Sequence, residues 1–94
     1  MLQNYRAETP LGYQQIAATA ALATPTIPAG TTLILVTPEG NACRWRDDGV
    51  NPTAAVGYPL AVSGELRYTA ATLTALRLIA QTGTTAYNFT YYGG

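Results

Sequence analysis

Hydrophobic and polar residues alternate along much of this chain, and the alternation predicts strands rather than helices. The run TTLILVT at residues 31–37 is β-branched and apolar, which is typical of a strand near the centre of a sheet. Residues 85–92 place three aromatic residues on one face and their neighbours on the other. Residues 65–69 alternate in the same way, so the pattern predicts a half-buried strand there.

Three further segments have a weaker pattern. Residues 13–18 favour a strand, although the alanines of residues 14–23 would also suit a short helix. Residues 73–81 fit a helix face or a strand face, and Thr72, Thr74 and Ile79 favour a strand. Residues 61–62 are expected to form a very short strand, ended by a Ser-Gly turn.

Proline and glycine divide the chain between these segments. The sequence Pro-Glu-Gly-Asn at residues 38–41 predicts a turn that joins strands 31–37 and 42–46 into a β-hairpin. Residues 47–60 contain two prolines and two glycines with little periodicity. We expect a long loop there, and loops of this length in small domains are often functional.

Six to eight short antiparallel strands with turns between them indicate an all-β fold, either a small β-sandwich or a jelly-roll-like barrel. Residues 1–12 are polar and irregular, with a proline and a glycine, and are expected to form an N-terminal arm. Residues 13–94 are expected to form a single β domain. A chain of 94 residues is long enough for only a modest core.

The composition is informative mainly because charged residues are scarce. Charged residues make up 11% of the sequence, against about 25% in an ordinary soluble domain. All the cations are arginines, and arginine and aromatic residues are favoured at protein interfaces. These features predict a homo-oligomer or an assembly subunit. The formal net charge of zero argues against binding to nucleic acid or to a membrane surface, and no signal peptide or membrane span is expected.

The sequence offers little material for catalysis. It has no histidine and a single serine, Ser63, so a Ser-His-Asp triad is excluded. Adjacent Asp47 and Asp48 would point apart in a strand, whereas paired catalytic carboxylates must converge. The lone Cys43 is interpreted as a small core residue. We therefore expect a protein that is not an enzyme, with no catalytic residues, no metal and no cofactor.

One short block concentrates the polar chemistry. Arg44, Trp45, Arg46, Asp47 and Asp48 hold four of the ten charges of the chain. Alternation places Cys43 and Trp45 on one side of a strand and the two arginines on the other. The arginines and aspartates would make ion pairs with a neighbouring protein or with one another. We predict that these five residues form a protein interface.

Other ligands were weighed for the same block and for the tyrosines. Asp47, Asp48 and Asn51 offer oxygen atoms to a cation, but their spacing is not that of a calcium loop. An aromatic residue between two arginines could stack on a base, although the aspartates cancel the local charge. A polysaccharide would use exposed aromatic residues, for which the candidates are Tyr58, Tyr68, Tyr87, Tyr91 and Tyr92. Tyrosine is also an ordinary strand residue, so most of these are expected to be packing or interface residues.

The order of several motifs resembles a known group of proteins. These motifs are TIPAGT at residues 26–31 followed by LILV, then ACRWRDDGVNPTA at residues 42–54 and GYPL at residues 57–60. The segment LRLIAQ and the closing NFTYY complete the pattern. Over about residues 13–92 the chain is similar to small structural proteins of tailed bacteriophages and prophages, and the RWRDDG block is its most specific part.

This resemblance implies a non-enzymatic virion component present in many copies. Within the group, a capsid decoration (cement) protein on the head surface is expected first. It would bind the major capsid protein or other virion proteins across shell subunits. A tail or head-fibre component is the alternative, and it could act as a carbohydrate-binding module for host attachment.

Overall fold

Antiparallel strands account for most of the computed structural model, which describes residues 9–19 and 21–93. A single 3-10 turn, η1 (Leu73–Ala75), is the exception to the β structure within these residues. The strands are β1 (Thr9–Thr19), β2 (Thr31–Glu39), β3 (Cys43–Arg46), β4 (Tyr58–Leu60), β5 (Leu66–Tyr68), β6 (Arg77–Ala80) and β7 (Thr84–Gly93).

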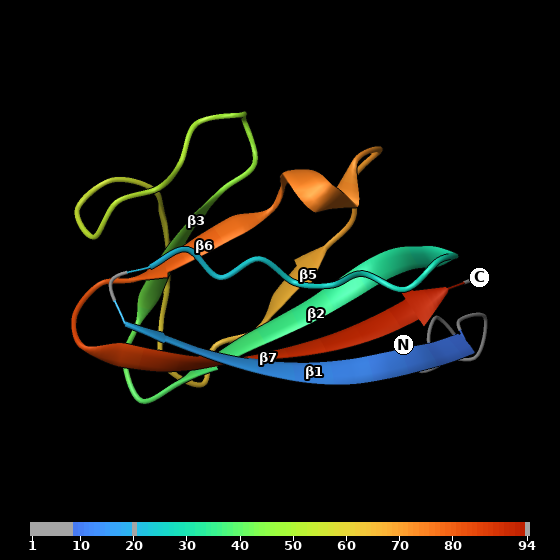
Figure 1. Ribbon diagram of the computed structural model, residues 1–94, viewed down its shortest axis with the longest axis horizontal. Helices are drawn as coiled ribbons and strands as arrows, with labels where there is room; N and C mark the ends of the chain where they lie inside the picture. Colours follow the sequence, from blue (N-terminus) through green and yellow to red (C-terminus); the bar gives the residue numbers. More distant parts are fainter. Residues whose placement is uncertain (1–8, 20, 94) are drawn as a thin grey trace.

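The strands form two separate sheets that pack face to face. Sheet A has four strands in the order β1-β7-β2-β5, and sheet B has three in the order β4-β3-β6. In Figure 1, sheet A forms the lower layer, and β3 and β6 cross above it. The predicted all-β class is confirmed, and of the two architectures expected the described residues form the sandwich.

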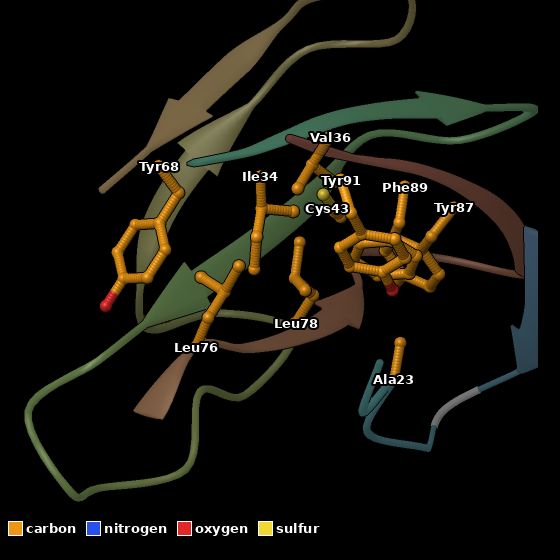
Figure 2. Packing of buried hydrophobic residues seen from close by; sticks show 10 residues of the cluster. All are labelled: Ala23, Ile34, Val36, Cys43, Tyr68, Leu76, Leu78, Tyr87, Phe89 and Tyr91. Carbon is orange, nitrogen blue, oxygen red and sulfur yellow. The ribbon is translucent and has the colours of Figure 1, made fainter. Parts of the chain in front are cut away.

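The core is built around the C-terminal strand. Strand β7 lies between β1 and β2 in antiparallel register, so it is paired on both edges. Its inward residues include Tyr87, Phe89 and Tyr91, which are at most 1% exposed. The ring centroids of successive members lie 6.3 and 6.4 Å apart in stacked geometry, and Figure 2 shows the three rings as one row. Large aromatic side chains thus supply much of the apolar area that holds this small domain together.

Sheet B covers this row from the opposite side. Leu76, Leu78 and Cys43 are fully buried and belong to the same cluster (Figure 2). Burial in this apolar layer raises the pKa of the Cys43 thiol to about 11, since the thiolate would lose its hydration. Ala23 forms an isolated bridge to Leu78 and closes one side of the core. The interpretation of Cys43 as a core residue agrees with this burial.

The predicted hairpin between strands 31–37 and 42–46 is wrong. Strand β2 pairs with β7 and β5, whereas β3 pairs with β4 and β6, so the chain crosses from one sheet to the other between them. Gly40 makes the crossing with a positive φ of 94°. Both edges of each strand are already occupied by other partners. A local turn pattern does not distinguish a hairpin from an arch between sheets, because the alternation of side chains is the same in both.

Some predicted boundaries also change. Strand β1 begins at Thr9, so residues 9–12 of the predicted arm lie in the sheet, while residues 1–8 are outside the described residues. The pairing of β1 with β7 continues past Gly12 and Pro10 through a register shift. Proline and glycine usually interrupt a strand, so the sequence did not predict this continuation. The short strand expected at 61–62 is a turn, and β4 lies just before it inside the predicted long loop. Residues 73–81 divide between η1 and β6.

Candidate functional site

Strand β3 separates the residues of the RWRDD block as the alternation predicted. Cys43 and Trp45 lie opposite Ala80 and Leu78 of β6, and both contribute to the core cluster. Arg44 and Arg46 lie opposite Ile79 and Arg77 on the other face. Asp47 and Asp48 follow the strand in the exposed turn that ends at Gly49. The block therefore stands where sheet B meets the loop of residues 47–57.

Arg44 serves the fold rather than an exposed surface. Its guanidinium donates from Nε to the carbonyl of Ala54 at 3.1 Å and from Nη1 to the carbonyl of Gly57 at 3.0 Å. These bonds hold the loop against the strand from which Arg44 projects. The loop also closes on itself, because the backbone N–H of Thr53 donates to the Val56 carbonyl at 2.8 Å. Arg44 is half-buried as a result, and it contributes least of the five to any outer contact.

Arg46 and Asp48 pair within the chain. The Nε and Nη2 atoms of Arg46 donate to the two carboxylate oxygens of Asp48, at 3.0 and 2.5 Å. The hydrogen bond to Arg46 is the main reason that the pKa of Asp48 lies below its usual value, and the same bond raises the pKa of Arg46. The side chains are 27% and 54% exposed, so solvent screens the pair and its value for stability is small. Of the pairings considered from sequence, the intramolecular one is present.

Asp47 is oriented by a buried tyrosine. The hydroxyl of Tyr68 donates to Oδ2 of Asp47 at 2.9 Å, and in Figure 2 this hydroxyl points away from the core cluster. Burial, followed by this hydrogen bond and the charge of Asp47, raises the pKa of Tyr68 to about 12. The ring of Tyr68 meets Trp45 edge to face, with centroids 6.0 Å apart. Sheet A thereby fixes a carboxylate that lies at the end of sheet B.

A pocket of about 540 Å³ opens beside this carboxylate. One wall is the turn of Arg46, Asp47 and Asp48, and the other is the segment of Val56, Gly57 and Tyr58. Trp45 lies between them, and these seven residues form the lining. Tyr58 stacks on Trp45 with ring centroids 5.3 Å apart and an interplanar angle of 21°. We call this the Trp45–Tyr58 pocket.

Four of the five predicted site residues line the pocket, and Arg44 does not. Sequence reasoning missed Val56 and Gly57 as site residues, although it noted the loop that carries them. The φ of Gly57 is 143°, and a β-carbon there would lie 3.0 Å from Cβ of Arg44. The feature of the sequence that could have indicated this wall is the glycine directly before the aromatic residue at position 58.

The other tyrosines weighed for a polysaccharide separate clearly by burial. Tyr68, Tyr87 and Tyr91 are core residues with at most 5% exposure, which agrees with their interpretation as packing residues and leaves them closed to a polysaccharide. Tyr58 is 68% exposed, and it is the candidate that reaches the pocket. Tyr92 is half-buried on the outer face of sheet A.

The chemistry of the pocket is that of binding. An aromatic ring offers a flat apolar surface, two carboxylates accept hydrogen bonds, and one guanidinium balances one of the two negative charges. Among residues 9–19 and 21–93, no group of three or more histidine, cysteine or acidic side chains is arranged to hold a metal ion. The described residues also contain no helix long and apolar enough to cross a membrane.

Comparison of the chain with models of protein families, with curated proteins and with solved structures found no match to any of them.

Proposed function

We propose that this protein is a non-enzymatic structural component of a tailed-bacteriophage virion, and that it acts as a capsid decoration protein. Copies would associate with one another and bind the head across shell subunits. Each contact adds buried area that must be exposed again before the shell comes apart. A specific contact of the usual size buries about 800 Å² on each partner, and repetition over a shell multiplies weak contacts through avidity.

The free edge of strand β1 is the observation that carries this proposal. Strand β1 has 11 residues and stands at the edge of sheet A, with β7 on its inner side. Among the described residues its backbone has no partner strand on the outer side. The strand sequence TPLGYQQIAAT contains no charged residue. Natural edge strands that must remain alone are usually short or protected by charges, prolines or bulges. Pro10 and the register shift beside it protect only the start of β1, so the neutral edge of residues 13–19 favours pairing with another chain.

The outer face of sheet A beside this edge is suited to a protein contact. The Nδ2 of Asn88 donates to Oε1 of Glu39 at 2.9 Å, and the Nε2 of Gln15 donates to Oδ1 of Asn88 at 3.0 Å. Tyr13 also donates to Asn88 and is 61% exposed. A surface whose polar groups already satisfy one another loses less hydration free energy when a partner covers it.

Purified phage particles provide the decisive test. The protein should be found on heads in many copies, which mass spectrometry with imaging of labelled particles would measure. A few copies confined to tails would favour the alternative tail or fibre component. Its absence from particles that assemble in cells expressing the gene would overturn the virion proposal.

Two sets of variants connect the proposal to residues. Ala17→Lys places a charge on the exposed side of β1 and should reduce self-association measured by sedimentation, whereas Val62→Lys at an exposed turn should not. Arg46→Ala and Asp48→Ala should lower occupancy on heads while the isolated domain stays folded. Normal occupancy of both variants would remove the RWRDD block from the shell contact.

A further inference from the structure

We propose that the Trp45–Tyr58 pocket binds a neutral sugar unit of a glycan. This inference concerns a ligand site on sheet B and does not depend on the shell contact proposed above. The β1 edge can bind the shell while the pocket holds a glycan, whereas a shell contact through Arg46 and Asp48 would compete with the glycan for the same residues.

The aromatic wall presents the surface that a sugar ring requires. One face of Tyr58 is supported by the indole of Trp45, 5.3 Å away, and Trp45 is held in turn by the edge of Tyr68. Because Tyr58 is 68% exposed, the rest of its ring is open to a ligand. The apolar C–H face of a pyranose packs on such a ring, and the ring needs little reordering when it binds.

The polar wall offers fixed hydrogen-bond acceptors. Asp47 uses Oδ2 for the Tyr68 hydroxyl, which leaves Oδ1 without a partner among the described residues. Asp48 accepts from Arg46 with both oxygens and also from the backbone N–H of Val50, so few of the about four acceptor positions of this carboxylate remain and Asp47 is the main acceptor of the wall. Acceptors whose orientation is fixed before binding lose little entropy when they meet hydroxyl groups.

The charge of the lining selects the class of sugar. Arg46, Asp47 and Asp48 together carry a formal charge of −1. A uronic or sialic acid would bring a second negative charge beside these carboxylates and would be repelled. A neutral hexose or N-acetylhexosamine brings hydroxyl donors and no charge, so the pocket favours that class.

A single protein side chain fits this pocket less well than a sugar. An incoming arginine seeks a bidentate carboxylate, but the fork of Arg46 already occupies Asp48 and the Tyr68 hydroxyl occupies one oxygen of Asp47. A volume of about 540 Å³ also lies within the range of small-molecule pockets, roughly 300–1,000 Å³. Each hydroxyl group of a sugar donates to one lone pair, and the lining offers such lone pairs on several separate side chains.

The chain provides its own reporter for the test. Trp45 is the only tryptophan of the sequence and lines the pocket, so its emission reports on occupancy. The full-length protein would be titrated with neutral oligosaccharides of glucose, galactose and N-acetylglucosamine, and with oligomers of their uronic acids. Concentrations up to about 20 mM would cover the millimolar affinities expected of one sugar subsite. We expect a saturable change with at least one neutral series and at least tenfold weaker binding of the uronic acids.

Matched variants assign the signal to the pocket. Tyr58→Ala should weaken binding at least tenfold, while Tyr13→Ala removes an exposed tyrosine from sheet A and should leave binding unchanged. Asp47→Asn keeps the shape but removes a charge, so it should narrow the preference for neutral over acidic oligomers. Circular dichroism would establish that each variant is folded.

Three results would overturn the proposal. The first is no saturable response to any neutral series, and the second is equal binding by Tyr58→Ala and the unchanged protein. The third is a saturable response to an arginine-containing peptide in place of the sugars, which would make the pocket an anchor for a protein partner. None of these results changes where the protein lies on purified particles, so the decoration proposal is tested separately.

Discussion

Sheet A and sheet B share one core, but different interactions hold them in place. In sheet A, β7 pairs along its length with β1 and β2 and turns a row of aromatic rings inward. In sheet B the strands have three or four residues, and the loop of residues 47–57 depends on the side chain of Arg44. Long ladders and large rings hold sheet A, whose free backbone groups lie along the edge of β1. The short strands of sheet B place charged and aromatic groups at the surface, where a ligand can reach them.

The largest effect is expected from the aromatic row. Phe89→Ala removes a fully buried ring that stacks on both Tyr87 and Tyr91. Urea denaturation should show a loss of about 3–5 kcal/mol in the free energy of unfolding, which is a large part of the stability of a small domain. Tyr58→Ala on sheet B is the comparison, and it should cost less than about 1 kcal/mol. Similar losses of stability for the two variants would contradict the conclusion that the aromatic row of sheet A stabilises the domain more than the exposed tyrosine of sheet B does.

The next largest effect is a dependence of stability on pH. It tests Cys43, which lies on the face of sheet B that packs against the core. The pKa of the Cys43 thiol is raised from 9.0 to about 11, so above pH 9 the unfolded chain releases this proton before the folded one does. Stability should therefore be constant below about pH 9 and fall as pH rises towards 11, by roughly 2–3 kcal/mol in full from this group. Denaturation midpoints measured across this range would show the fall.

Cys43→Ala is the control for that experiment. It should flatten the dependence between pH 9 and pH 10, while the buried Tyr68 and Tyr91, whose pKa values are about 12, add a further fall at higher pH. An unchanged profile in Cys43→Ala would mean that the thiol is not the group that titrates.

A smaller effect is expected where the loop meets sheet B. Gly57→Ala would bring a β-carbon within 3.0 Å of Cβ of Arg44 and 3.2 Å of Cβ of Pro52, at a φ of 143°. We expect a loss of about 2 kcal/mol, together with a changed emission of Trp45 as the pocket wall shifts. Gly49→Ala, whose β-carbon would meet no atom within 4 Å, controls for a positive φ alone. If both variants lose the same stability, the close contact with Arg44 is not the cause.

The smallest expected effect is a gain in stability. The hydroxyl of Tyr87 is buried and makes no hydrogen bond of normal geometry among the described residues; burial is the main reason that its pKa is raised, and the Thr85 side chain is the smallest influence on it. Tyr87→Phe keeps the ring and removes the unpaired hydroxyl, so it should raise the free energy of unfolding by about 1 kcal/mol. Tyr91→Phe is the control, because its hydroxyl donates to Gln14 at 2.9 Å and its loss should destabilise. A loss of stability in Tyr87→Phe would show that the hydroxyl is bonded in solution.

The candidate site was predictable from the chain only in part. Trp45, Arg46, Asp47 and Asp48 could be recognised because charged residues are rare elsewhere in this sequence and Trp45 is its only tryptophan. The opposite wall, from Val56 to Tyr58, could not be assigned, because a long loop returns to strand β3 only through contacts such as those of Arg44. Alternation grouped Tyr91 with the other aromatic residues of its strand face, but only the structure showed that Tyr58, from the predicted loop, is exposed beside Trp45.

Alternation and turn residues by themselves determined that this chain forms short antiparallel strands, that Cys43 and Trp45 share one face of their strand, and that the aromatic residues of β7 lie together on one face. Those properties follow from the two-residue period of a strand, which is local. Only the tertiary structure decided which strands pair, because an arch and a hairpin between residues 31–37 and 42–46 have the same local pattern. It also decided that Arg44 supports the loop and that the pocket opens between Asp47 and Tyr58, since both depend on contacts between segments distant in sequence.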